Sequence, residues 1–181
     1  MNKVLKGKFH NITVGELDFE GVVDEIINWM KERPASSYNV IVGCDSSSSE
    51  EPHFPVAIVV LRKGEGGRFF LKKAKYKDKR FYNWRQRILE EVLLSCDLAL
   101  VLREKLKEKV EKANRELSQS EEIVGGKKFD YQFRYIHADV GAEGVTKDMI
   151  KEVTGLIRGN GFEPKIKPEA YAATVVADRF S

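Results

Sequence analysis

Acidic residues stand at four places where elements of the chain begin or end, and together they could bind a divalent metal ion. The candidates are Asp45, Glu91 or Glu90, Asp139 and Asp178. Carboxylates brought close together repel one another, and a divalent cation is the usual way to neutralise them. Oxygen ligands without cysteine favour Mg²⁺ or Mn²⁺ over zinc. Two such ions about 4 Å apart can promote phosphodiester hydrolysis, and Asp45 is best placed to bridge them.

Each acid also has an ordinary structural explanation. Asp45 precedes a row of serines and could cap the turn that follows it, and Asp139 could serve the turn at Gly141. Asp178 could pair with its neighbour Arg179 or face solvent. The joint placement of the acids favours a catalytic site over four separate structural roles.

The choice between Glu90 and Glu91 depends on the helix that carries them. Both flank its apolar stripe, but Glu91 lies on the side of Ser95 and Ala99, small residues that let a helix approach a sheet closely. We therefore favour Glu91 and keep Glu90 as the alternative. A solvated glutamate remains the structural explanation for either one.

Two polar residues beside the aspartates are secondary candidates. Ser46 is the first hydroxyl residue after Asp45, and His137 precedes Asp139 by two positions on the same strand face. His137 could act as a general acid or base, but a packed, hydrogen-bonded histidine is the preferred interpretation.

Basic and aromatic residues are interleaved between positions 72 and 87, just before the helix that carries Glu91. Such a strip could neutralise phosphates and offer rings for base stacking. Lysines that protect a solvated edge strand are the structural alternative. The nucleic-acid-binding candidates are Lys73, Lys75, Arg80, Trp84, Arg85 and Arg87.

The pattern of apolar residues predicts the elements that position these side chains. Residues 1–17 read as an irregular lead-in, followed by a helix that Asp18 caps and that ends before Pro34. Strands follow at 39–44, 54–62 and 68–76, with a glycine hairpin between the last two. A long helix from Arg80, a strand at 129–140, a helix capped by Thr146, an edge strand at 162–167 and a terminal helix complete the order.

Strands 39–44 and 129–140 are connected through a helix, so the right-handed crossover rule makes them parallel neighbours. Their carboxyl ends, with Asp45 and Asp139, then lie side by side, where open α/β sheets bind ligands. The charged half of the long helix, residues 103–117, is expected to project from the core or to pack on another subunit.

With 181 residues, 42% of them hydrophobic, the chain fits one domain over 1–181, with 1–35 as an N-terminal helical extension and 103–128 as a charged helix extension and connection. A net charge of +3 does not by itself indicate a nucleic-acid partner. Cys44 and Cys96 are expected to be buried reduced thiols. Without a signal-like or membrane-spanning run, a cytoplasmic location and no membrane partner are the default.

Several motifs resemble the YkuK-like family of uncharacterised ribonuclease-H-like proteins over residues 36–181. They are GCDSS, GGRFF, RQRILEEVLLS, IHADVG and GNGFEPKIKPEAYAATVVADRFS. The chain departs from the family pattern at Cys44, where a threonine is expected, and at Ser47, where a glutamine is expected. The resemblance implies metal ligands at Asp45, Glu91 or Glu90, Asp139 and Asp178.

These observations predict an α/β, ribonuclease-H-like fold with a mixed five-stranded sheet and an extra N-terminal helix. The leading functional hypothesis is a Mg²⁺- or Mn²⁺-dependent nuclease or related phosphoryl-transfer enzyme that acts on RNA, RNA–DNA hybrid or structured DNA. The alternative is a non-catalytic nucleic-acid-binding or scaffold module. A phosphatase of small substrates is a third option, and the sequence has no Walker-type phosphate loop. A homo-oligomer through the 103–117 helix is also predicted.

Overall fold

A seven-stranded mixed sheet in the order β2-β1-β5-β4-β3-β6-β7 forms the centre of the computed structural model, which describes residues 5–49, 52–76, 79–119 and 128–177. The strands are β1 (Phe9–Asn11), β2 (Gly15–Leu17), β3 (Ser37–Cys44), β4 (Phe54–Arg62), β5 (Gly66–Ala74), β6 (Asp130–Ala138) and β7 (Glu163–Lys165). The helices are α1 (Phe19–Glu32), α2 (Trp84–Gln119), the single turn η2 (Lys147–Met149), α3 (Ile150–Gly159) and the π-helical η3 (Ala172–Ala177). The predicted α/β class is confirmed.

The predicted parallel pairing of the two central strands is confirmed. Strand β3 pairs with β6 in parallel, and Cys44 stands opposite Ala138 at their carboxyl ends. Asp45 and Asp139 are the next residues of their strands, so both follow the same edge of the sheet. Strand β7 adds to β6 in parallel as the edge strand that Pro164 predicts.

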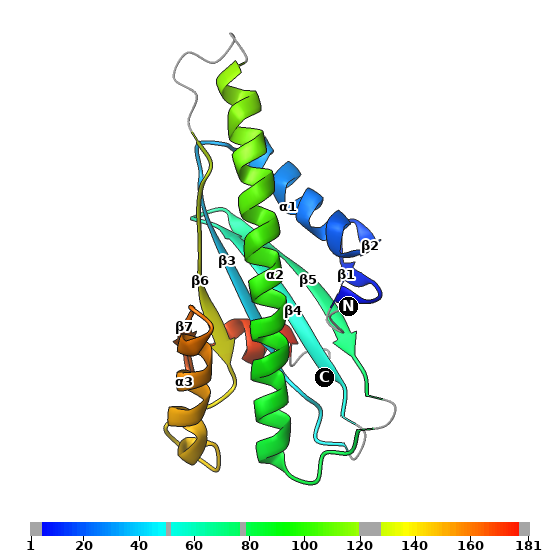
Figure 1. Ribbon diagram of the computed structural model, residues 1–181, viewed down its shortest axis with the longest axis vertical. Coiled ribbons are helices and arrows are strands. Elements are labelled where there is room, and N and C mark those ends of the chain that lie inside the picture. The colour runs from blue at the N-terminus through cyan, green and yellow to red at the C-terminus, as the bar shows by residue number, and fades with distance from the viewer. Residues whose placement is uncertain (1–4, 50–51, 77–78, 120–127, 178–181) are drawn as a thin grey trace.

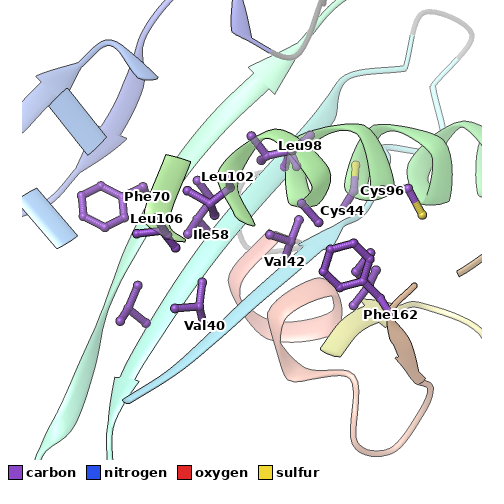
Figure 2. Packing of buried hydrophobic residues seen from close by; sticks show 14 of the residues in the cluster. Val40, Val42, Cys44, Ile58, Phe70, Cys96, Leu98, Leu102, Leu106 and Phe162 are labelled. Carbon is purple, nitrogen blue, oxygen red and sulfur yellow. The ribbon is translucent and has the colours of Figure 1, made fainter. Parts of the chain in front are cut away.

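Helices cover both faces of the sheet. Helices α1, α2 and α3 lie over one face, and η3 lies over the other (Figure 1). Figure 2 shows Val40 and Val42 of β3 beneath Leu98 and Leu102 of α2. Leu98 and Leu102 are fully buried, and burial of each such side chain contributes about 2 kcal/mol. The alternation of β-strand side chains thus anchors α2 on the face opposite η3.

The distal half of α2 packs inside the chain. Its residues Leu106, Val110 and Ala113 are buried in the main core, and Lys109 forms an ion pair with Asp24 of α1 at 2.5 Å. Figure 1 shows α1 lying beside this half. The expectation that 103–117 projects from the core is wrong, because α1 covers the apolar stripe of this segment. Packing of its exposed face on another subunit stays a prediction.

Two strands of the sheet were missing from the prediction. Residues 1–17, expected to be irregular, include the hairpin β1–β2, which pairs with β5. The Asn11 amide donates to the Phe69 carbonyl oxygen at 2.7 Å and ties the hairpin down. Strands of three residues are too short to show a clear alternation. The predicted count of five strands is therefore low by two.

The start of α1 agrees with the prediction, and the starts of the later helices differ from it: the terminal helix, predicted to open at Pro168, begins at Ala172. The Asp18 carboxylate accepts from the Gly21 N–H at 2.8 Å and caps α1 as predicted. Helix α2 begins at Trp84 instead of Arg80, because Asn83 accepts from the Gln86 N–H at 3.0 Å. Thr146 makes no capping bond to η2. Its hydroxyl instead accepts from the Gly141 N–H at 3.1 Å.

Both cysteines are buried and free, as predicted. Within the described ranges, none of the helices combines the length and the apolar character needed to cross a bilayer.

Candidate functional site

The backbone after β3 holds Asp45 at the end of the sheet. The Asp45 N–H donates to the Pro55 carbonyl oxygen, and the Ser47 N–H donates to that of His53, both at 3.2 Å. The His53 N–H returns a bond to the Ser47 hydroxyl at 3.1 Å. The antiparallel hydrogen bonds between the β3 and β4 segments therefore continue beyond the last residue of β3, and they fix the backbone position of Asp45.

Glu91 reaches this end of the sheet from α2. Its side chain is buried, and the Ser46 hydroxyl donates to Oε1 at 2.5 Å. The pKa of Glu91 is raised to about 8, mainly by burial and also by the nearby charges of Asp45 and Asp139, while Ser46 and Arg87 oppose the shift. Since both aspartates act on Glu91 electrostatically, the fold brings three of the predicted acids into one neighbourhood.

Asp139 has a buried oxygen without a hydrogen-bond donor among the described residues. Oδ1 of Asp139 lies 2.9 Å from the Lys167 ammonium, but this ion pair lacks hydrogen-bond geometry. The Lys167 N–H donates to the Val140 carbonyl oxygen at 2.9 Å, which brings the lysine to the end of β6. A carboxylate oxygen that is buried and lacks a directed donor is one that a metal ion or a substrate group can satisfy.

Glu90 points to a different set of partners. The Tyr76 hydroxyl and the Lys79 ammonium both donate to its carboxylate. Among the two glutamates, Glu91 is therefore the one near Asp45 and Asp139. Asp178, the fourth predicted ligand, lies outside the described residues.

His137 faces η3 and contacts it through one ring nitrogen and through the ring edge. Its Nδ1 accepts from the Ala172 N–H at 3.1 Å, and its ring packs edge-on against Tyr171 at 4.6 Å. Burial lowers the pKa of His137 to about 4, helped by the charge of Lys165 and opposed by that of Glu169. The neutral ring thus orders the terminal helix, as the structural interpretation of this histidine predicted.

The basic residues divide into those near the acids and those further along the chain. Arg87 donates to the Ser47 carbonyl oxygen at 3.1 Å and lowers the pKa of Glu91, so it stands beside the acids. Arg85 lies 3.9 Å from Asp148 and stacks on Trp84 at 5.2 Å. Lys73, Lys75 and Arg80 are exposed.

Part of the predicted strip is used for packing instead. Lys72 is buried, lies 5.3 Å from the ring of Phe9 and donates to the Lys6 carbonyl oxygen. Burial lowers its pKa to about 8. Tyr76 and Phe81 pack with Phe54 at 5.5 and 4.9 Å. Tyr82, by contrast, is 81% exposed.

The acids suit a hard divalent cation by their chemistry. Asp45, Glu91 and Asp139 offer only carboxylate oxygens, which Mg²⁺ and Mn²⁺ prefer. Within the described part of the chain, however, no three histidine, cysteine or acidic side chains stand close enough together to hold a metal ion. Ion binding at these acids thus requires their carboxylates to move toward one another.

Lys167 is the residue of this site that sequence reasoning missed. It lies two positions beyond β7, which pairs with β6 and ends at the same edge of the sheet. The order of the strands carries that signal, since it places the segment after β7 beside the end of β6.

A family model described as Ribonuclease H-like matches residues 21–181. The chain belongs to the ribonuclease H-like family. The uncharacterised protein YkuK of Bacillus subtilis (strain 168) is 29% identical over 177 residues, which cover 96% of each chain. No solved structure matches. The similarity to YkuK predicted from the motifs is confirmed.

The ribonuclease H-like match explains the architecture described above. It spans β3 to η3 together with most of α1, and it begins after the β1–β2 hairpin. The carboxyl ends of β3 and β6 and the first turns of α2 all lie inside it. The three described acids thus belong to the part of the chain that the family shares.

Proposed function

We propose that this protein is a divalent-metal-dependent nuclease, or a related phosphoryl-transfer enzyme, that acts on RNA, RNA–DNA hybrid or structured DNA. One observation carries the proposal. Glu91 is buried against the charges of Asp45 and Asp139, which keeps its pKa near 8. Like charges gathered in a buried position lower the stability of the fold. Such positions are typical of functional sites, where a bound cation would neutralise the charges.

Asp45, Glu91 and Asp139 are the residues that would hold Mg²⁺ or Mn²⁺, with Asp178 as a proposed fourth ligand. Ions held by these carboxylates would supply activation of water and stabilisation of the oxygen that leaves phosphorus. Ser46 orients the Glu91 carboxylate through its 2.5 Å hydrogen bond. The buried Asp139 Oδ1, for which the described residues supply no directed donor, fits a ligand role.

Cations beside the acids would bind the phosphates of the substrate. Arg87 is held next to the Asp45 loop by its bond to Ser47, so its guanidinium can contact a phosphate close to the acids. Arg80 and Arg85 are exposed before and at the start of α2, and Trp84 and the exposed Tyr82 offer rings for unpaired bases. Lys73 and Lys75 would extend the same contacts along the backbone.

Cleavage assays on labelled RNA, RNA–DNA hybrid and branched DNA test the proposal. We expect cleavage with Mg²⁺ or Mn²⁺ that EDTA abolishes and that falls by about 10³-fold or more in Asp45→Asn and Asp139→Asn proteins. The matched control is Asp130→Asn, since Asp130 lies at the opposite end of β6 and pairs with Ser37. Equal cleavage by the Asp45→Asn and wild-type proteins would refute the site assignment.

A non-catalytic nucleic-acid-binding module is the second candidate, and one observation favours it. The Lys167 ammonium already lies against Asp139, and the described acids are too far apart to form a three-residue metal site. This function predicts binding of nucleic acid in EDTA, weakened by salt, with no turnover under any metal. Fluorescence anisotropy with an intact labelled RNA recovered at the end would distinguish the two functions.

A further inference from the structure

Lys167 brings a positive charge to the same carboxylate that the proposed function assigns to a metal ion. Its ammonium lies 2.9 Å from Oδ1 of Asp139, while 49% of the lysine side chain remains exposed to solvent. The residue therefore contacts Asp139 on one side and open solvent on the other. A substrate phosphate that approaches Asp139 would meet this ammonium.

The backbone places Lys167 there. Its N–H donates to the Val140 carbonyl oxygen at 2.9 Å. The stem of the lysine then crosses Gly141, where a Cβ would come within 3.2 Å of the Lys167 Cβ and 3.6 Å of its Cδ. The absence of a side chain at Gly141 thus leaves the path along which Lys167 reaches Asp139.

We infer that Lys167 couples ion binding to substrate binding. When substrate is absent, its ammonium competes with the metal ion for Asp139. When substrate is present, the ammonium binds a phosphate oxygen. The inference rests on the proposed function. A divalent ion on Asp139 repels the neighbouring ammonium and weakens its ion pair. An incoming phosphate attracts both cations and gives the displaced ammonium a new partner.

Lys165 provides a matched comparison two residues earlier in the chain. Its ammonium pairs with Glu169 at 2.7 Å and lies 5.3 Å from the ring of Tyr135. The charge of Lys165 lowers the pKa of His137, whereas the charges that act on Glu91 are those of Asp45, Asp139 and Arg87. A substitution at Lys165 removes the same charge on the η3 side of the sheet.

Mn²⁺ binding to the full-length protein, measured by calorimetry and by the electron paramagnetic resonance of free Mn²⁺, tests the competition. Lys167→Met should bind Mn²⁺ about tenfold more tightly than wild type, because a neighbouring cation is removed. Lys167→Arg and Lys165→Met should bind it as wild type does. Unchanged or weaker Mn²⁺ binding by Lys167→Met, in a protein with wild-type circular dichroism, overturns the inference.

Binding of a fluorescein-labelled RNA 12-mer at saturating Mn²⁺ tests the second half. The Lys167→Met protein should bind this RNA about tenfold more weakly, and Lys167→Arg should retain most of the affinity. Opposite changes in ion and RNA affinity mark a coupling residue, because a purely structural role would weaken both. Weaker binding of both ligands, or unchanged RNA affinity, would overturn the inference.

The outcomes separate this inference from the proposed function. If neither wild type nor Lys167→Met binds Mn²⁺, the metal site and the lysine inference both fail. If both bind Mn²⁺ equally and Asp139→Asn does not bind it, the metal site stands and the lysine inference alone is overturned.

Discussion

His137 and Glu91 are both buried titratable residues, yet the groups that surround them differ. His137 accepts a backbone hydrogen bond from η3, and burial holds its pKa near 4. Glu91 lies among charges of its own sign, and its pKa is near 8. Burial is the main cause of both pKa shifts and leaves each residue neutral at pH 7, but only Glu91 also has charges of its own sign nearby. Burial alone therefore does not mark a functional site.

The surroundings of the two residues differ in the same way. Around His137, the face under η3 is closed by small side chains, among them Ala172 and Ala173, and by Gly43 of β3. Around Glu91, two further acids lie nearby, and Asp139 keeps a buried oxygen that has no directed donor among the described residues. We therefore propose that the first region stabilises the fold and that the second binds a ligand.

Substitution of the two residues should give the largest contrast. Glu91→Gln should lower metal-dependent cleavage by about 10³-fold while the free energy of unfolding at pH 8 stays the same or rises, because a repelled charge is lost. His137→Ala should lower the free energy of unfolding by about 2 to 4 kcal/mol through a cavity and an unpaired Ala172 N–H. Urea unfolding and cleavage rates per folded molecule measure both effects. A His137→Ala protein that folds normally but cleaves as poorly as Glu91→Gln would contradict the comparison.

The pH dependence of stability should also separate the two residues. The pKa of Glu91 rises from 4.5 to about 8 on folding, so the native state holds the extra proton and the free energy of unfolding falls as pH rises through this window. The pKa of His137 falls from 6.5 to about 4, so stability is lost as pH falls from 6.5 toward 4. For Glu91 the change is on the order of a few kcal/mol.

Urea unfolding at intervals from pH 4 to pH 9 in EDTA measures these slopes. Glu91→Gln should remove the loss of stability toward alkaline pH, which spans pH 4.5 to about 8. The opposite loss that His137 causes between pH 6.5 and 4 should then become steeper, because the two windows overlap. Added Mn²⁺ should also reduce the alkaline loss, since the ion favours the charged carboxylates. If the free energy of unfolding still fell toward alkaline pH in Glu91→Gln, a group other than Glu91 would be responsible for the fall.

Gly43 offers a way to break the closed region without touching a titratable group. A Cβ at Gly43 would come within 2.7 Å of the Ala173 nitrogen and 2.9 Å of the Ala172 carbonyl carbon, both backbone atoms that cannot rotate away. Gly43→Ala should therefore displace η3 and cost about 2 kcal/mol of unfolding free energy.

Gly141→Ala is the matched control for Gly43→Ala. The new Cβ at Gly141 would lie 3.2 Å from the Lys167 Cβ and 3.9 Å from the Glu143 carbonyl oxygen, so the neighbouring atoms need to shift by only a few tenths of an ångström. We expect this substitution to cost less than about 1 kcal/mol. Equal losses of unfolding free energy in the two variants would contradict the expected difference between the tightly packed face under η3 and the region around Glu91.

Much of this arrangement follows from the sequence. The apolar run of β3 and the stripe of α2 predict their own layers, and the crossover rule predicts that Asp45 and Asp139 lie side by side. Small residues around Ser95 predict the close approach that buries Glu91. Local pattern and chain connectivity determine these features, so they can be read before any coordinates are known.

Other features depend on packing that no local pattern records. The charged face of the 103–117 segment resembles a free surface, and only its contact with α1 shows that its apolar stripe is covered. Lysines 72 and 73 are neighbours of one type, but Lys72 is buried and Lys73 is exposed. Lys167 enters the site through strand order alone. Side chains whose role depends on tertiary contacts were the ones misjudged or missed.

Ser46 should give the smallest effect and the finest test of the comparison. Its hydroxyl donates to Glu91 at 2.5 Å, and this bond lowers the pKa of Glu91 against the effect of burial. Ser46→Ala should therefore raise that pKa further and reduce cleavage at pH 7 by about fivefold to tenfold, roughly the value of one hydrogen bond to a charged group. The deficit should shrink as pH rises, because the carboxylate then ionises without help. Ser48→Ala is the control, since Ser48 is exposed in the same loop. A deficit that stays constant from pH 6 to pH 9 would mean that Ser46 acts on loop geometry and not on the charge of Glu91.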